Sequence, residues 1–282
     1  MRKLSLLIAA AIAIAAWPVG AASIAAHAPQ NRVDTSLEAV LAKAAAYLQE
    51  YRDKLSYVMA TERSKQRLVG GFAGSIGTDE TLASDVYFVY IPADKVWMAV
   101  RDVEIVDGKT IKDRDNVRDI LNSGQVGAAR ALKDRNARYN LGTILRNFNE
   151  PTLSLLVLDD QHRGRFTFVR QNARGNAVTI SFLEHAQPTL IIDTGGRPAY
   201  SSGEFTIDAA TGQIDKATLK VRLSGGIDST LTTTYRQDRK LGMAVPAKFD
   251  EQYDLGGKRP EKVTSTSTYS DYSRFDVSVR IK

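Results

Sequence analysis

Two carboxylates, Asp102 and Glu104, stand two positions apart in a β-prone stretch, so their side chains should lie on one face of a strand. Their backbones should be about 6.6 Å apart, a spacing that suits the acid and base pair of a hydrolase. The neighbouring basic residues can pair with them without any catalysis: Arg101, Lys112, Arg114 and Arg118. We favour the ion-pair interpretation and keep a carboxylate-dependent hydrolase as a third alternative.

A second group carries the ligand types that zinc and iron prefer: Asp159, Asp160, His162, Glu184 and His185. If a hairpin turns at residues 172–176, Phe168 lies opposite Ile180 and Phe166 lies opposite Phe182. In that register the two imidazoles point to opposite faces of the sheet. The sequence therefore argues against a metal site.

Other chemistries have little support. The chain has no Cys, which excludes thiolate metal sites, disulfides and cysteine nucleophiles. It lacks the G-x-S-x-G elbow of serine hydrolases, and the glycines at positions 70, 71, 74 and 77 fit no nucleotide-binding pattern. We expect no cofactor and no catalytic residue.

The composition is that of an ordinary globular protein, with 282 residues of which 43% are hydrophobic and 25% charged. The net charge is +6, from 38 basic and 32 acidic residues. Without Arg2 and Lys3, which belong to the segment described next, 36 basic against 32 acidic residues leave +4. This mild excess predicts no nucleic-acid partner.

Residues 1–28 have the layout of a secretory signal peptide: Arg2 and Lys3, an uncharged apolar run, then Pro18 and small residues. Cleavage is compatible with positions after Ala21, Ala22 or Ala28, and an uncleaved membrane anchor is the alternative. We expect a linker over 29–34, a single domain over 35–282, and a periplasmic or secreted protein with no stable transmembrane segment after cleavage.

The clearest helix should begin at the capping box formed by Thr35 and Glu38 and run to about Leu55. Its apolar residues recur every three or four positions and form one stripe. Residues 113–148 also turn helical, and residues 151–158 form either a short buried helix or a buried strand.

Most of the remaining chain predicts strands. About three are expected between residues 56 and 106, followed by an Asp107-Gly108 hairpin turn. Seven or eight more are expected between residues 165 and 281 as an antiparallel meander, with an alternating last strand from Phe275 to Ile281.

Several motifs resemble a family of uncharacterised secreted bacterial proteins. They lie at residues 83–88 (ASDVYF), 101–103 (RDV), 106–108 (VDG), 113–115 (DRD), 137–142 (ARYNLG) and 149–153 (NEPTL), and later segments up to residues 269–275 (YSDYSRF) continue the match. More distantly, the late hairpins are similar to those of the outer-membrane lipoprotein localisation factors. That resemblance implies an α+β fold with a curved antiparallel sheet, an incomplete barrel whose concave face is covered by helices.

The function predicted from this fold is a non-enzymatic periplasmic or secreted binding protein, a carrier of lipid or another apolar ligand. Concave apolar space under helices is the usual form of a small-molecule site. The alternative is a cell-envelope module that binds another protein and has no ligand cavity. The family-like motifs place the binding or framework residues at Arg101, Asp102, Asp107, Arg114, Tyr139 and Asn140.

Overall fold

The computed structural model describes residues 33–275 apart from 72, 73, 75, 92–95, 115, 124 and 147. The predicted signal peptide, most of the linker, and the alternating residues predicted after Phe275 lie outside the described residues. Within them, no helix is both long and apolar enough to cross a membrane.

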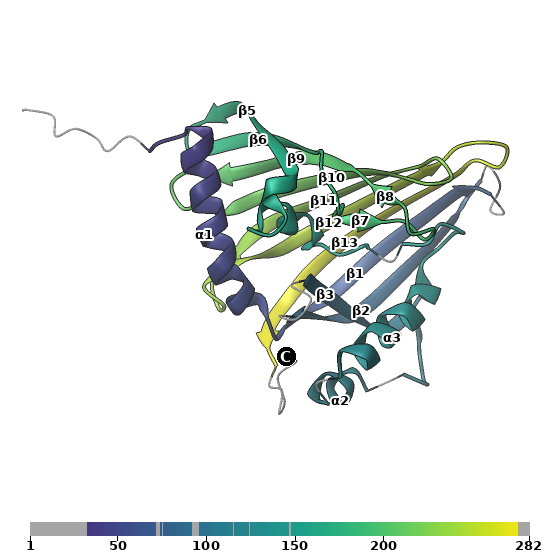
Figure 1. The fold of residues 1–282 in the computed structure, drawn as a ribbon. Coiled ribbons are helices and arrows are strands. Elements are labelled where there is room, and N and C mark those ends of the chain that lie inside the picture. The colour runs from purple at the N-terminus through teal and green to yellow at the C-terminus, as the bar shows by residue number, and fades with distance from the viewer. Residues whose placement is uncertain are drawn as a thin grey trace, which may run out of the picture. The chain divides into compact units, whose positions relative to one another are not determined.

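Helix α1, Leu37–Leu55, packs one apolar face on the sheet (Figure 1). Its buried residues, spaced by three or four, are Val40, Ala44, Leu48, Tyr51 and Leu55. The helix is capped by Ser36, whose Oγ accepts from the Ala39 amide at 3.4 Å, so the prediction that Thr35 is the cap was wrong by one residue. The predicted stripe holds from Ala44 to Leu55, whereas in the first two turns Val40 is buried and the predicted Leu37 and Leu41 are only partly buried.

Eleven strands of the described chain form one antiparallel sheet, in the order β4-β3-β2-β1-β13-β12-β11-β10-β9-β6-β5. Its first part is β1 (Val58–Gly70), β2 (Thr78–Ile91), β3 (Val96–Val106) and β4 (Lys109–Thr110). Its second part is β5 (Phe166–Arg174), β6 (Ala177–Glu184), β9 (Ser201–Asp208), β10 (Ile214–Leu223), β11 (Ile227–Asp238), β12 (Met243–Leu255) and β13 (Glu261–Arg274). The sheet is curved and not closed into a barrel (Figure 1). The predicted α+β class with an open, curved antiparallel sheet is confirmed.

Short elements complete the fold. Strands β7 (Ile191–Ile192) and β8 (Pro198–Ala199) form a separate small hairpin. Between residues 137 and 165, the described chain also forms three 3₁₀ helices: η1 (Ala137–Tyr139), η2 (Leu153–Leu158) and η3 (Arg163–Arg165). The short buried segment left open by the sequence is therefore helical, as η2.

The two faces of the sheet are covered differently. On the concave face, α1 and η2 pack on the larger core, which includes Phe88, Trp97 and Phe249. Helices α2 (Val117–Asn122) and α3 (Val126–Asn136) pack on Tyr87, Val89 and other residues of β2 and β3 that alternate with the first set. They therefore cover the opposite face at that end of the sheet.

Two local predictions were wrong. Residues 113–148 are not continuously helical, because regular helix ends at Asn136 and the chain after η1 is irregular. In the β5–β6 hairpin Phe168 lies opposite Phe182 and Phe166 opposite Glu184. The register is offset by two because the pairing shifts between Arg170 and Asn172 and the strands turn at residues 175–176.

Gly212 sets how closely α1 approaches the sheet. It has φ +79°, and a Cβ there would lie 2.3 Å from the Lys43 carbonyl oxygen. Beside it, Lys43 Nζ donates to the Ala209 carbonyl at 2.8 Å. A side chain at position 212 would therefore push α1 away from the β9–β10 turn.

We predict that Gly212→Ala lowers the free energy of unfolding, measured by urea denaturation, by more than Gly225→Ala does. Gly225 has the same φ of +79°, but a Cβ at this position would meet no atom within 4 Å, so it reports only the backbone cost of roughly 1–2 kcal/mol. Equal losses in the two variants would show that α1 is not seated against Gly212.

Candidate functional site

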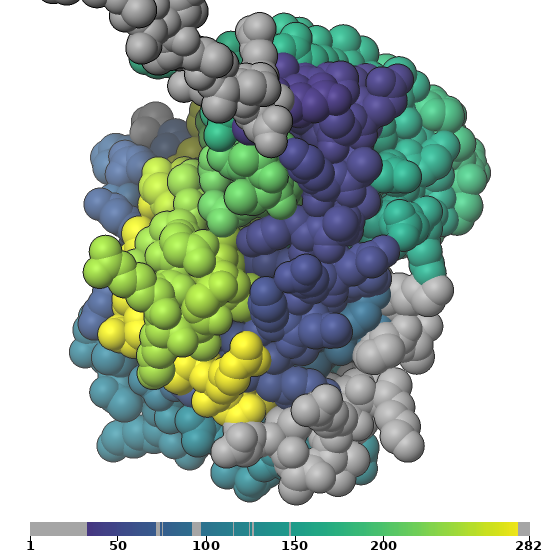
Figure 2. Space-filling view, turned by 90° about the vertical axis from the view of Figure 1, so that its left-hand side faces the viewer, coloured from purple at the N-terminus to yellow at the C-terminus, as the bar shows by residue number. Residues whose placement is uncertain are grey.

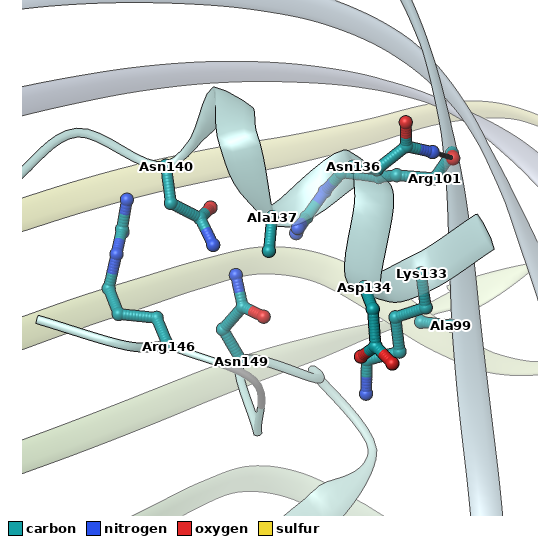
Figure 3. A pocket seen from close by; sticks show the side chains of 9 residues that line it. All are labelled: Ala99, Arg101, Lys133, Asp134, Asn136, Ala137, Asn140, Arg146 and Asn149. Atoms are coloured by element: carbon teal, nitrogen blue, oxygen red, sulfur yellow. Dashed lines mark hydrogen bonds between the residues drawn. The ribbon is translucent and has the colours of Figure 1, made fainter. Parts of the chain in front are cut away.

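A polar pocket lies beside β3, between α3 and the chain that crosses the sheet after η1 (Figure 3). Its polar lining residues are Arg101, Lys133, Asp134, Asn136, Asn140, Arg146 and Asn149, several of which point toward a common space (Figure 3). Its cavity is about 20 Å³, enough for a single water molecule. The pocket is too small for an organic ligand.

Arg101 forms the first buried ion pair of this region. Its guanidinium binds both carboxylate oxygens of Glu62, with Nη2 to Oε1 at 3.0 Å, and Glu62 is fully buried. The Tyr269 hydroxyl donates to the same carboxylate at 2.9 Å. Burial disfavours the charge of Arg101, but Glu62 outweighs it, so the pKa of Arg101 is raised above its ordinary value.

Arg146 forms the second buried ion pair of this region, with Glu251. It is 1% exposed, and its Nη1 lies 3.8 Å from Glu251 Oε2. The Tyr253 hydroxyl donates to that carboxylate at 2.8 Å, and Arg146 Nη2 donates to Gln66 Oε1. Burial raises the pKa of Tyr253, and the Glu251 charge raises it further, so its hydroxyl stays a donor.

These residues belong to a polar band that crosses the concave face. On β1, Glu62, Ser64 and Gln66 are buried at every second position. In register, Glu62 faces Tyr269, and Gln66 faces Ser265, which in turn faces Glu251 on β12. The band is a row of side chains that need hydrogen-bond partners from the layer above.

The layer above the band is formed by residues 137–146 and 148–150, which we call the covering segment. Gln66 Nε2 donates to the Tyr139 carbonyl at 2.7 Å, and the Leu141 amide donates to Gln66 Oε1 at 3.2 Å. The amide and hydroxyl of Thr143 donate to Glu261 at 2.8 and 2.9 Å. These polar contacts hold the covering segment to the sheet, together with the packing of Ile144 and Phe148 on the core.

Asn149 and Asn136 join this network to β3. With its side-chain amide oriented so that the oxygen faces Arg101, Asn149 accepts from Arg101 Nη1 at 3.2 Å and donates to the Arg146 carbonyl at 2.6 Å, which links the two arginines. Asn136 Nδ2 donates to the Arg101 carbonyl, and α3 packs along β3. The side chain therefore satisfies a backbone group of β3 from outside the sheet.

The six predicted site residues fall into four places. Arg101 and Asn140 line the polar pocket, and Tyr139 contributes its carbonyl to the band. Asp102 and Arg114 lie on the other face of β3, where Arg114 Nη1 is 3.4 Å from Asp102 Oδ1 and 2.6 Å from Glu104 Oε1. The two candidate catalytic carboxylates thus share one guanidinium, as the ion-pair interpretation predicts.

Asp107 belongs to a turn. Its backbone has φ 47°, and its carboxylate accepts from the Thr81 amide and hydroxyl at 2.8 and 3.1 Å. These contacts fix the β3–β4 turn on β2. The residue is part of the framework and lies outside the polar pocket.

Sequence analysis missed four central residues of the band: Glu62, Gln66, Arg146 and Glu251. The residues from Thr61 to Arg67 are almost all polar, so no apolar alternation marked them as a strand. One sequence feature did indicate a strand here: Glu62, Ser64 and Gln66 alternate with basic residues. This two-residue period is that of a β-strand whose buried face is polar.

Two of the carboxylates considered for a metal, Glu184 and Asp159, have other partners. Glu184 accepts from the Leu190 amide at 2.6 Å and from Ser201, while Asp159 pairs with Arg52 at 3.1 Å. Among the residues that the structure describes, no three His, Asp or Glu side chains gather as a metal site would need.

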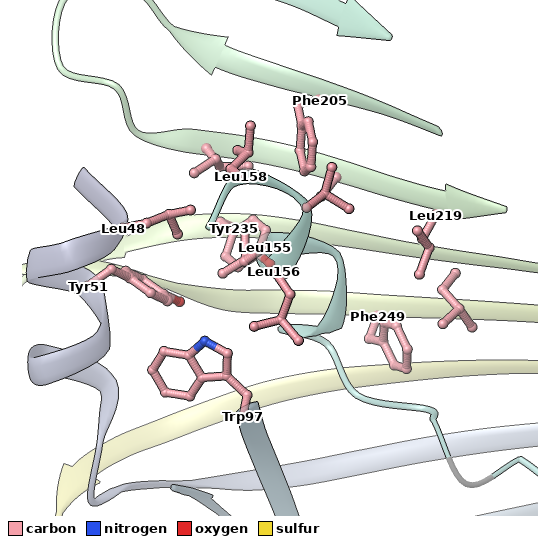
Figure 4. Packing of buried hydrophobic residues seen from close by; sticks show 14 of the residues in the cluster. Leu48, Tyr51, Trp97, Leu155, Leu156, Leu158, Phe205, Leu219, Tyr235 and Phe249 are labelled. Atoms are coloured by element: carbon pink, nitrogen blue, oxygen red, sulfur yellow. The ribbon is translucent and has the colours of Figure 1, made fainter. Parts of the chain in front are cut away.

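The apolar interior under α1 is filled by η2. Leu155, Leu156, Val157 and Leu158 of η2 are all at most 4% exposed. Figure 4 shows Leu155, Leu156 and Leu158 among Leu48 and Tyr51 of α1 and aromatic residues of the sheet. The Pro151 carbonyl accepts from the hydroxyls of Thr233 and Tyr235 at 2.7 and 2.9 Å, which fixes the start of η2. In Figure 2, α1 lies closely packed between its neighbours on this side.

An apolar cleft remains at the other end of the concave face, where β10, β11 and β12 meet the covering segment. Its apolar lining is Ile144, Leu145, Phe148, Ile192, Leu223, Ile227 and Leu255. Its volume is about 230 Å³, larger than the roughly 150 Å³ apolar cavity known to bind benzene in another protein. Leu145 and Ile192 are 51% and 60% exposed at its rim.

Comparison with known proteins gives only distant matches. No family model matches the chain, and no curated protein matches it. Among solved structures, the chain is similar to a LolA superfamily protein. That protein, from Nitrosomonas europaea, is 10% identical, with a TM-score of 0.32 over 86% of this chain and 96% of the other.

Two further structures match. A DUF1329 family protein from Desulfovibrio piger is 11% identical, with a TM-score of 0.37 over 86% of this chain and 94% of the other. A structure described as lipid–protein interactions in lipovitellin is 6% identical, with a TM-score of 0.27 over 80% of this chain and 26% of the other. All three structures are at most 11% identical to this chain, and each match is a distant similarity of fold alone.

We predict that Glu62→Gln lowers the free energy of unfolding by about 3–5 kcal/mol, because it leaves the buried Arg101 guanidinium without its counter-charge. Urea denaturation at neutral pH measures the loss. The control is Asp79→Asn, which removes the exposed partner of Arg67 and should cost only about 0–1 kcal/mol. Similar small losses in both variants would contradict the buried pair.

The pH dependence of stability should reveal the titration of His162, the residue that directly precedes η3. Burial lowers its pKa, and the charge of Arg165 lowers it further, below the ordinary value of 6.5. Below about pH 6.5 the unfolded chain therefore takes up a proton before the folded one does, so stability is present above this pH and is lost as the pH falls.

We predict that His162→Gln makes the decline in unfolding free energy between pH 7 and pH 5 shallower than in the unmodified protein, as measured by urea titrations at several pH values. His185→Gln removes an exposed imidazole and is the matched control. If the unfolding free energy of the His162 variant declined as steeply as that of the unmodified protein, the lowered pKa of His162 would be contradicted.

Proposed function

We propose that this protein is a non-enzymatic periplasmic or secreted binding protein that takes up a lipid chain or another apolar ligand. The observation that carries the proposal is the apolar cleft, with the exposed side chains of Leu145 and Ile192 at its rim. Large exposed apolar groups around a concavity are typical of ligand-binding surfaces.

The lining of the cleft indicates the kind of ligand. Six of its seven apolar side chains are aliphatic, and its polar members include Thr143, Asp193, Thr194 and Ser224. A hydrogen bond from Ser224 lowers the pKa of Asp193, and bonds from backbone amides lower it further, so this carboxylate is charged. Because no basic side chain of the described residues lines the cleft, an uncharged aliphatic chain fits it better than an anionic group does.

A second candidate is a cell-envelope module that binds another protein. The interior beneath α1 favours it, because η2 and the core side chains fill that interior and the polar pocket holds about 20 Å³. The two candidates differ in where an apolar ligand would be found: a carrier binds it in the cleft, whereas the interaction module binds none.

We predict that the neutral fluorophore N-phenyl-1-naphthylamine binds the purified protein, and that the double variant Leu145→Asp/Ile192→Asp raises its Kd by about tenfold or more. Burying two aliphatic side chains against a ligand contributes about 1.5–3 kcal/mol each, and a carboxylate at the rim opposes it. A fluorescence titration measures the Kd.

The control for this titration is Ile76→Asp, which places the same carboxylate on a side chain that is 87% exposed and outside the cleft. It should leave the Kd unchanged. Absence of saturable binding, or equal loss in the control, would contradict the carrier proposal and favour the interaction module.

A further inference from the structure

Strand β5 ends the sheet with one side unpaired. It pairs with β6, and no other strand of the described chain joins it. Its outward amides and carbonyls are a template on which another extended chain can form a ladder. Thr167, Val169 and Arg170 are exposed, so this edge is open to solvent.

An open groove runs between β5 and α1, which we call the edge groove. Leu41, Ala42, Ala45 and Ala46 of α1 form one side, and Phe168 of β5 forms the other. In Figure 2 the teal residues of the β5 region lie along one side of the purple helix. Alternate side chains of a strand added to β5 would point into this groove, because successive residues of a strand face opposite sides.

The opposite side of the edge is also apolar. Val169 and Leu183 belong to one face of the β5–β6 pair, away from the core, and are 51% and 57% exposed. They are two of the few large hydrophobic side chains exposed in the described chain. A strand added beside β5 would therefore find apolar contacts on both of its faces.

The positive charge along β5 and η3 favours an acidic partner strand. Arg163, Arg165, Arg170 and Arg174 follow one another along η3 and β5, and within the described chain none forms an ion pair with a carboxylate. Glu38 and Asp160 also line the groove, which leaves the edge with an excess of positive charge. An acidic strand complements this excess.

A second copy of this chain fits the edge poorly. Antiparallel pairing of two β5 strands would bring Arg170 and Arg174 of one close to those of the other, and like charges across strands are unfavourable. The shift in pairing between Arg170 and Asn172 also interrupts a regular edge. Both features disfavour self-association through β5. The regular part of the edge, from Phe166 to Arg170, remains able to pair with an acidic strand of another protein.

We propose that β5 and the edge groove form a docking site for an extended acidic segment of a partner protein, which adds to the sheet beside β5 and places alternate apolar side chains in the groove. This site lies on a different part of the fold from the apolar cleft, and it goes beyond the proposed ligand binding.

The test uses a fluorescein-labelled peptide of about ten residues in which Glu and Val alternate, with a Lys and Val peptide as its charge-reversed control. Fluorescence anisotropy with the purified protein should show saturable binding of the Glu peptide and at least about tenfold weaker binding of the Lys peptide. Hydrogen exchange should show new protection of β5 amides.

The double variant Arg170→Glu/Arg174→Glu should weaken binding of the Glu peptide by about tenfold, whereas Lys220→Glu, an exposed reversal on β10, should not change it. N-phenyl-1-naphthylamine binding should be the same in all three proteins, which separates this site from the cleft. Equal affinity for both peptides, protection away from β5, or a dimer abolished by the double variant would overturn the proposal.

Discussion

The pairing of charges buried on the concave face is the constraint on which the arrangement of this fold depends. Glu62 and Glu251 are buried on the concave face of β1 and β12, where they pair with Arg101 of β3 and with Arg146 of the covering segment. Removing a counter-charge from such a site is far more costly than losing a surface pair. The covering segment therefore has to follow the positions of its partners on the sheet, and it gives up regular helix in doing so.

The concave face is consequently divided into two regions. Toward β5, β6 and β9 it is hydrocarbon, and α1 and η2 cover it with side chains that pack without a large cavity. Toward β12, β13 and β1 it carries the polar band, and the covering segment lies over it. The apolar cleft lies at the ends of β10 and β11, between the covering segment and residues 192–194.

An element of this fold could be predicted from the sequence only where its buried residues are mostly apolar. Helix α1 and strand β6 could be predicted, because most of their buried residues are apolar and recur with a clear period. Most of β1 could not, since Glu62, Ser64 and Gln66 are polar and yet inward-facing. The apolar spacing of residues 141–148 suggested a helix, but Ile144 and Phe148 contact the core from an irregular chain that Arg146 holds in place.

The same segment links the polar and apolar parts of the candidate site. Arg146 is directed into the polar band, while its neighbours Ile144 and Leu145 line the apolar cleft. The ion pair with Glu251 and the bonds of Thr143 to Glu261 thus fix the wall of the cleft from behind. A wall that is anchored in this way is formed before any ligand arrives, and preorganisation of this kind reduces the entropy lost on binding. Burying these charges is unfavourable in a hydrocarbon core. Their pairing nevertheless holds the covering segment in place, and this keeps the apolar cleft open.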